Sequence, residues 1–474
     1  MHDRLTTLDA SFLAMEDEVT PMHVGSVMIF DIPTQGLDYA KLVAHIANRI
    51  AFVPRYRQRL RTVPGGVARP VWVDDERFDV TYHVRRSALP RPGSDEQLEE
   101  LVARIMPRAL DRSRPLWEVY VVEGLADRRF AIISKAHQVL VDGIHAVDLT
   151  HVILDDTVDT MTDRGMTWRA GRAPSDSELF VGALADAVRA PGQVLEAVSG
   201  GVADIRATAG RAVRGAGSLI RAVARASARP APTSPLNATV GRARRFVMIG
   251  TDLADYRQIR NRLAKGAFGE DITVHDVILA TISGAMRAWL LTRGEPIHPG
   301  STVRALVPVS VVDDDAEHGH QLAACFVDLP VGEAAPGIRL HQIAFAMRQQ
   351  MEGGHAVGAR ALAGLGGFSP PTIHALSARL AGAVSRRMYN VALTNVPGPQ
   401  KPLYVAGARL VASYPVMPLG PGHALSIGLT SYDGGVYFGI YTDRDAIPDA
   451  DVLGQAVVES LHELLEAPSP RRRA

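Results

Sequence analysis

The sequence has little cysteine, no net charge and no long apolar run, and each absence excludes a class of protein. Its 474 residues include one cysteine, Cys325, which excludes a disulfide framework or a CxxC metal site and suits a small core residue in a reducing cytoplasm. Because 51 basic residues balance 51 acidic ones, no global field attracts nucleic acid. No run approaches the roughly 20 apolar residues that span a membrane, and acids interrupt the N-terminal stretch where a signal peptide would be apolar. We therefore expect only peripheral membrane contact.

The length and the order of elements predict two domains of mixed strands and helices. A chain this long exceeds one ordinary core, so two domains of about 200 residues are expected. Periodicity predicts helices over 39–52, 96–109, 273–291 and 450–465, and strands over 23–32, 117–123, 130–138, 302–310, 324–331 and 391–396, with a hairpin over 425–443. Strands that alternate with helices indicate an α/β layer architecture.

A basic segment rich in small residues divides these two regions. We expect an N-terminal subdomain over 1–185, a basic helical crossover over 186–235 and a C-terminal subdomain over 236–474. Within the crossover, residues 202–225 are typical of an amphipathic helix with arginines on one side. Three interpretations stay open, because such a helix can lie on an anionic membrane or lipid droplet, pack on the protein as a bridge, or remain disordered.

The stretch Lys135-Ala136-His137-Gln138-Val139-Leu140-Val141-Asp142-Gly143 holds the residues most typical of a reaction site. It begins in a predicted buried strand and ends in a loop, a place that can present side chains to a cleft. Successive residues of a strand point to opposite faces, so His137 and Gln138 are expected to point in opposite directions. Neither side chain can simply replace the other.

This stretch resembles the HHxxxDG motif of the bacterial wax ester synthase/diacylglycerol acyltransferase family, which belongs to the CoA-dependent acyltransferases with an HxxxD core. Further likenesses, in the same order along the chain, are LTTLDASFLAMEDEVTPMHVG at 5–25, Pro115-Leu116-Trp117, LNATVGRARRF at 236–246, LVPVS at 306–310 and Asn395-Val396-Pro397-Gly398-Pro399. The likeness covers nearly the whole chain and is strongest to mycobacterial-type members.

The resemblance implies a fold and a reaction. The fold is α/β, with two chloramphenicol acetyltransferase-like subdomains of mixed sheets and an active-site channel at their interface. The reaction is transfer of an acyl group from long-chain acyl-CoA, as co-substrate, to diacylglycerol or a long-chain alcohol, giving triacylglycerol or wax ester. No other cofactor and no metal is implied. The protein would be cytoplasmic, peripheral to the inner membrane or to lipid droplets.

Gln138 departs from the motif at its second histidine, which is the general base in the family. The resemblance implies that Asp142 orients the site through an ion pair and that Gly143, which has no side chain, leaves room for the substrate. A carboxamide has no proton that titrates near neutral pH, so Gln138 cannot be a general base, and losing a base typically costs about 10²–10⁴-fold in rate. The alternative is a catalytically degenerate member that binds acyl-CoA or lipid.

A second departure follows at His275-Asp276, where the family usually has Asn-Asp near the active site. We expect Asp276 in the substrate channel, and one hypothesis makes His275 a relocated base; the alternative is a residue that hydrogen-bonds locally at a helix start. His137 is either an alternative base or a buried support for the loop, and His145 is a weaker candidate.

Two further motifs have both a functional and a structural interpretation. Asn395, Pro397 and Gly398 form either a loop beside the substrate channel or a stiff turn. Trp117 is interpreted as a packing anchor in preference to a substrate contact.

Overall fold

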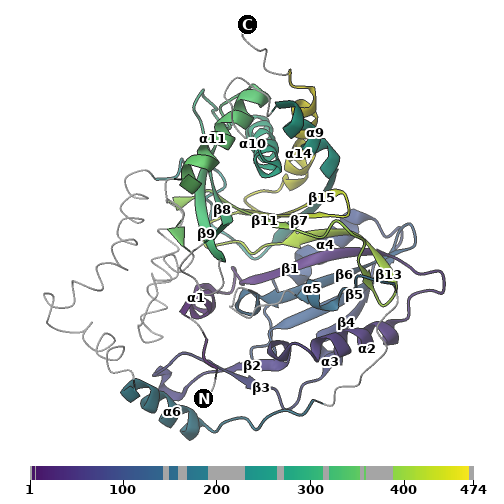
Figure 1. The fold of residues 1–474 in the computed structure, drawn as a ribbon, viewed down its shortest axis with the longest axis vertical. Coiled ribbons are helices and arrows are strands. Elements are labelled where there is room, and N and C mark those ends of the chain that lie inside the picture. The colour runs from purple at the N-terminus through teal and green to yellow at the C-terminus, as the bar shows by residue number, and fades with distance from the viewer. Residues whose placement is uncertain are drawn as a thin grey trace, which may run out of the picture.

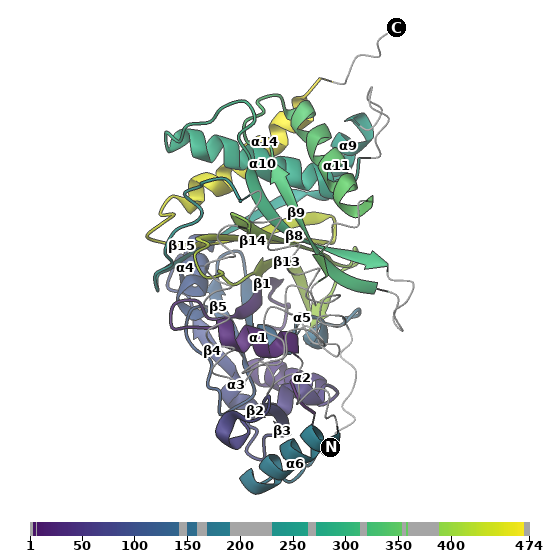
Figure 2. The ribbon, with the colours of Figure 1, turned by 90° about the vertical axis from the view of Figure 1, so that its left-hand side faces the viewer.

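Two mixed β-sheets lie face to face near the middle of the molecule (Figure 1). The coordinates are a computed structural model that describes residues 3–5, 7–141, 149–158, 168–189, 230–263, 272–312, 320–352, 357–358 and 388–468. Helices α2 and α3 lie below the first sheet, whereas α9, α10, α11 and α14 lie above the second (Figures 1 and 2). This is the predicted α/β architecture with two sheet-rich subdomains.

The first half supplies four strands of the six-stranded sheet, whose order is β12-β13-β1-β6-β5-β4. Its elements are α1 (Thr7–Met15), β1 (His23–Asp31), α2 (Tyr39–Ile50), η1 (Pro54–Arg57), β2 (Gln58–Arg61), η2 (Pro64–Gly66), β3 (Val71–Asp74), α3 (Val80–His83), β4 (Val84–Ala88), α4 (Asp95–Ile105), β5 (Trp117–Leu125), β6 (Arg129–His137), η3 (Gln138–Leu140), α5 (Leu149–Ile153) and α6 (Asp176–Arg189). All neighbours in this sheet are antiparallel except β4 and β5.

The second half forms a seven-stranded sheet of order β10-β9-β8-β11-β14-β15-β7, in which β11 runs parallel to both β8 and β14. Its elements are β7 (Arg244–Asp252), α9 (Leu253–Leu263), α10 (Val274–Thr292), β8 (Val303–Val312), β9 (His320–Leu329), α11 (Pro336–Glu352), β10 (Val357–Gly358), β11 (Val391–Pro397), β12 (Tyr404–Val405), β13 (Ala408–Val416), β14 (Leu425–Tyr432), β15 (Gly435–Asp443) and α14 (Ala450–Glu466).

Strand β13 crosses from the second half into the first sheet, where it pairs antiparallel with β1. On its other side it packs on β14 and β15, because Gly428 and Gly439 stand opposite each other and present no side chain. A Cβ built on Gly439 would lie 1.8 Å from the carbonyl oxygen of Pro415 in β13. The division at residues 185 and 235 stays a prediction, but residues 404–416 of the third range build the first sheet.

Several predictions from the sequence are confirmed by the structure. Leu42, Ile46 and Ile50, which the four-residue spacing places on one face of α2, are all fully buried. The hairpin turns at Asp433 and Gly434, both with positive φ. Cys325 is buried, as expected of a small core residue. Residues 202–225, the predicted basic helix, lie outside the described residues.

Helix α10 is the described helix long and apolar enough to match a membrane span by length and composition. Its apolar window is 72% buried inside the molecule. Leu279, Ile282 and Met286 pack in the core that α9, α11, α14 and the second sheet share. Burial of this kind is typical of a helix in the core of a globular protein.

Candidate active site

His137 and Gln138 lie at the end of β6, next to the start of β1. His137 is the last residue of the strand and pairs with His23, and its N–H donates to the carbonyl of Leu116 at 2.9 Å. The chain then turns into the single turn η3, and the N–H of Gln138 donates to the carbonyl of Met22 at 2.8 Å. Backbone hydrogen bonds from three segments therefore fix this corner.

His137 is buried, and both ring nitrogens are engaged. The N–H of Val139 donates to Nδ1 at 3.1 Å, so Nδ1 carries a lone pair and no proton. The proton of the neutral ring must then be on Nε2, which lies 3.3 Å from Oε2 of Glu16. This imidazole has no free lone pair to remove a proton from an alcohol. These contacts agree with the interpretation of His137 as a buried support for the loop, because they hold the turn that follows the strand.

Glu16 lies between His137 and the buried His23, and the sequence analysis did not identify either Glu16 or His23 as part of this site. Burial alone would raise the pKa of Glu16, but the hydrogen bond from His137 and the guanidinium of Arg112 hold that pKa at about 2. His23 lies edge-on to His137, with ring centroids 6.1 Å apart. Burial lowers the pKa of His23 to about 3, and its Nδ1 is 2.9 Å from the carbonyl of Met106. The Glu16 carboxylate is thus ionised at this corner.

Lys135 is fully buried on the same face of β6 as His137. Its ammonium donates to the carbonyls of Ile105, at 3.0 Å, and Arg108. Ile105 is the last residue of α4, and a cation at the C-terminal end of a helix is favoured by the helix dipole. Burial lowers the pKa of Lys135 to about 8. A lysine within an otherwise apolar strand was the sequence signal that could have predicted this group.

Gln138 is half-buried and lies in η3. The predicted strand parity stops one residue earlier, because His137 caps this turn and the chain leaves the pleated sheet there. Gln138 is therefore not the next residue of the face that carries Ile132 and Ser134. Asp142, Gly143 and His145 lie outside the described residues.

The second departure from the family pattern, His275-Asp276, lies at the start of α10. Thr273 caps this helix by accepting from the N–H of Asp276 at 3.1 Å, and the carboxylate of Asp276 accepts from the N–H of Thr273 at 2.8 Å. This reciprocal pair is a capping box. Asp276 is buried and hydrogen-bonds Thr273 through both its backbone N–H and its carboxylate, so it fixes where the helix begins.

His275 meets Asn395 across the interior of the second half. Nδ2 of Asn395 lies 2.8 Å from Nδ1 of His275. The other ring nitrogen, Nε2, is buried and has no hydrogen-bond partner among the residues that the structure describes. Burial lowers the pKa of His275, although the adjacent carboxylate of Asp276 opposes this. The structure thus brings together two of the residues that the sequence proposes for one site.

The motif that contains Asn395 extends further into the sheet than predicted. Asn395, Val396 and Pro397 still belong to β11 and pair with β14. The N–H of Gly398 donates to the carbonyl of Ser431 at 2.9 Å. A Cβ on Gly398 would lie 2.5 Å from that oxygen, so only glycine fits here. The turn follows the strand end at Pro397.

Trp117 is a packing anchor, as predicted. It is fully buried at the start of β5. Its ring stacks on His83 with centroids 4.4 Å apart, and Nε1 donates to the carbonyl of Tyr56 at 2.7 Å. These contacts tie β5 to η1 and α3.

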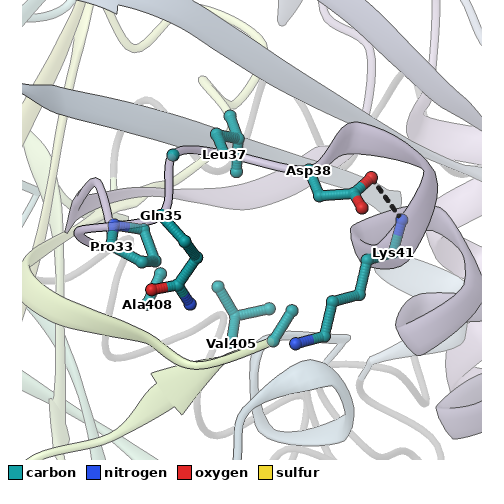
Figure 3. Close-up of a pocket in the computed structure, with 9 residues that line it drawn as sticks. Pro33, Gln35, Leu37, Asp38, Lys41, Val405 and Ala408 are labelled. Atoms are coloured by element: carbon teal, nitrogen blue, oxygen red, sulfur yellow. Dashed lines mark hydrogen bonds between the residues drawn. The ribbon is translucent and has the colours of Figure 1, made fainter.

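A shallow pocket of about 220 Å³ lies at the opposite end of β1 from this corner (Figure 3). Its lining combines the loop before α2 with residues 405–408, and the side chains of Gln35 and Lys41 extend along it toward Val405. Asp38 accepts from the backbone N–H of Lys41, so its carboxylate caps α2. The register places Asp31 at this end and His23 at the other, so the pocket is separate from the His137 corner.

Comparison with protein families decides the identity of the fold. The model of the wax ester synthase/diacylglycerol acyltransferase catalytic domain matches residues 5–277, and the model of the WS/DGAT C-terminal domain matches residues 318–465. The chain belongs to this family. It is accordingly an acyltransferase, and the segment that bears His137 and Gln138 falls within the catalytic-domain match.

Mycobacterial relatives agree with this membership. A probable diacylglycerol O-acyltransferase of Mycobacterium tuberculosis (strain ATCC 25618 / H37Rv), tgs1, is 33% identical over 477 residues, which cover 99% of this chain and 97% of the relative. A second, tgs3 of the same strain, is 47% identical over 263 residues, which cover 55% of this chain and 97% of the relative.

Solved structures share the architecture. The wax ester synthase/diacylglycerol acyltransferase of Marinobacter aquaeolei VT8 superposes with a TM-score of 0.66 at 29% identity and covers 97% of this chain and 98% of that one. The first condensation domain of the CDA synthetase superposes with a TM-score of 0.58 at 17% identity and covers 100% and 99%. The second likeness concerns the fold alone, which is chloramphenicol acetyltransferase-like, as predicted.

Proposed function

We propose that this protein transfers a long-chain acyl group from acyl-CoA to the hydroxyl of diacylglycerol, or of a long-chain alcohol, and so makes triacylglycerol or wax ester. The observation that carries the proposal is the match of residues 5–277 to the catalytic domain of the family, with the His137-Gln138 corner inside it. The relative tgs1, similar over nearly the full length, is named as a probable diacylglycerol O-acyltransferase. No metal or further cofactor enters the proposal.

Acyl transfer at this corner must proceed without an imidazole at position 138. The oxygen of the acceptor hydroxyl forms a bond to the carbonyl carbon of the thioester, the C–S bond breaks, and the hydroxyl proton ends on the sulfur of CoA. Gln138 can hydrogen-bond the hydroxyl and orient it but cannot take its proton. Orientation and proximity then supply the acceleration that remains.

The direct test is release of free CoA from long-chain acyl-CoA by the purified protein, followed with a thiol reagent, with and without dioleoylglycerol or hexadecanol. We expect release that depends on the acceptor, together with the ester as product by mass spectrometry. Release at the uncatalysed rate with every acceptor would reject acyl transfer by this chain.

A second candidate is a binding protein that retains the fold without the reaction. The carboxamide at Gln138 favours it, because the base of the family motif is absent. Binding of acyl-CoA in calorimetry, with no CoA release under any acceptor, would be the result expected of such a protein. Acceptor-dependent CoA release would exclude it.

We further propose that the protein acts on the surface of the inner membrane or of lipid droplets, with helix α6 in contact with lipid. The proposed acceptors are apolar and concentrate there. Three neighbouring apolar side chains of α6 are exposed, namely Phe180 at 45%, Val181 at 62% and Leu184 at 59%. The helix lies at the end of the molecule far from α10 (Figures 1 and 2), and six arginines follow it between residues 190 and 229.

Vesicle flotation tests this lipid contact. We expect the wild type to float with vesicles of phosphatidylglycerol and phosphatidylcholine, and Phe180→Ser/Leu184→Ser to lose at least about half of the bound fraction, since each buried apolar side chain contributes roughly 1.5–3 kcal/mol. The matched control is Phe345→Ser on α11, where Phe345 is also exposed, at 52%. Equal flotation of both variants would exclude α6 as the contact.

A further inference from the structure

His275 has a hydrogen-bonding atom that the described chain leaves unused. Its Nε2 is buried without a partner among the described residues, whereas Nδ1 is held by Asn395. A buried polar atom without a partner destabilises the folded protein, so such an atom calls for an explanation, and a ligand is one.

The contact with Asn395 decides which nitrogen carries the proton. An amide nitrogen has two N–H groups and accepts no hydrogen bond, so Nδ2 of Asn395 donates to Nδ1 of His275. The neutral ring therefore has its proton on Nε2. The atom without a partner is a donor, and it would be satisfied by an oxygen that accepts.

We propose that Nε2–H of His275 donates a hydrogen bond to the carbonyl oxygen of the acyl thioester and stabilises the oxyanion that forms as the acceptor attacks. The inference rests on the proposed acyl transfer and names the residue that assists it. His275 gives up no proton and takes none. Asn395 is a positioning residue, because it acts only by fixing the tautomer of this ring.

The surroundings of His275 suit a donor and oppose a base. The residue is the second of α10, where the positive end of the helix dipole stabilises a developing negative charge. The same dipole and the burial disfavour a second proton on the ring, which agrees with the lowered pKa of His275. A neutral imidazole can thus serve as a donor throughout the physiological pH range.

Within the part of the chain that the structure describes, strand β11 is paired on one side only at Asn395. Its ladder with β8 includes only Val391 and Ala392, whereas its ladder with β14 continues to Pro397. At Asn395 the edge toward β8 has therefore no strand partner among the described residues. A ligand that reaches Nε2 need not displace a backbone hydrogen bond at this edge.

Two substitutions at position 275 separate the donor role from its alternatives. We expect His275→Phe to lower kcat about 10²–10³-fold, the usual loss for one oxyanion donor, with KM for acyl-CoA nearly unchanged. His275→Asn restores an N–H donor and should stay within about tenfold of the wild type. Equal loss in both variants would indicate a base, and no loss in either would indicate a structural residue; both results would overturn the proposal.

The tautomer supplies a readout that does not depend on activity. In ¹⁵N spectra of the full-length protein, the signal assigned by its loss in His275→Asn should show protonated Nε2 and unprotonated Nδ1. Asn395→Asp replaces the donor by an acceptor, so the proton should move to Nδ1 and kcat should fall although the thermal unfolding midpoint is retained. A wild-type ring with its proton on Nδ1 would overturn the inference.

Ligand titration distinguishes failure of this inference from failure of the proposed function. Palmitoyl-CoA, added without acceptor, should shift the Nε2 signal, and the S-hexadecyl thioether of CoA, which lacks the carbonyl, should not. A protein that shows this difference but releases no CoA would refute acyl transfer while retaining the contact. A protein that releases CoA with no such shift would refute the contact alone.

Discussion

At the residue scale, two adjacent residues at the corner between β6 and η3 have different roles. His137 supports the turn, and Gln138 occupies the position of the general base in the family motif. His137 is locked by Val139 and Glu16, so its imidazole is occupied, while the next side chain, Gln138, is half-buried in the following turn. A reacting group must be held in place by neighbours whose own side chains are locked by packing and hydrogen bonds, and His137 is such a neighbour. The motif can therefore lose its base at 138 and keep its framework.

Replacing Gln138 by histidine should raise the rate. We expect Gln138→His to increase kcat for acyl transfer about 10²–10⁴-fold, because an imidazole removes the acceptor proton during attack. The gain should appear as an acid limb in the pH profile, since a protonated ring is no base.

Gln138→Leu is the matched control for this substitution. It keeps the size of the side chain and loses its hydrogen bonds, so its rate should fall below that of the wild type. A Gln138→His protein that folds like the wild type and gains nothing would show that the framework lacks more than a base.

At the scale of elements, α4 and β7 connect the two halves through a carboxyl group. Oε1 of Glu99 accepts from the N–H of Met248 at 2.7 Å. Burial raises the pKa of Glu99 to about 7, with the carboxylates of Asp451 and Glu96 adding to the shift and the Met248 hydrogen bond opposing it. This group is therefore protonated in the folded protein at pH values where the unfolded chain is ionised.

The raised pKa of Glu99 determines how the stability of the folded protein changes with pH. Between the ordinary value of 4.5 and about 7, the folded state binds more protons than the unfolded one, so stability from Glu99 falls as pH rises. We expect Glu99→Gln to match the wild type at pH 4.5 and to be more stable by roughly 2 kcal/mol at pH 8, after a discount for partial exposure. Denaturant unfolding at both pH values measures this, and a constant difference between them would contradict it.

Elements with strong local signals could be predicted from the sequence, and the others could not. The spacing in α2 and the Asp433-Gly434 turn each follow from local chemistry, so both were correct. Strand β13 was missed because its place beside β1 depends on pairing across nearly the whole chain. The same limit applies to the site: the motifs of His275 and Asn395 were evident, but only the fold brings them into contact.

At the scale of the whole molecule, two glycines determine how closely the sheets approach. Gly428 and Gly439 face Pro415 of β13. We expect Gly439→Ala to destabilise the protein by about 3 kcal/mol, because its Cβ would displace the Pro415 carbonyl and overpacking costs roughly 1–3 kcal/mol even without a backbone clash.

Thermal unfolding of the variant measures this effect. Gly337→Ala, at the start of α11, is the control, since a Cβ there meets nothing within 4 Å and should change stability by less than about 1 kcal/mol. Equal unfolding midpoints for the two variants would contradict the close approach.

The crossing of β13 also sets an order of events during synthesis. A ribosome that has released residues 1–235 has made β1, yet the strand that covers its outer edge, residues 408–416, is still to be translated. Until then β1 is an open edge that another nascent chain can pair with. The six-stranded sheet is thus completed only when nearly nine-tenths of the polypeptide has been made, and its β1 edge stays open to such pairing in the meantime.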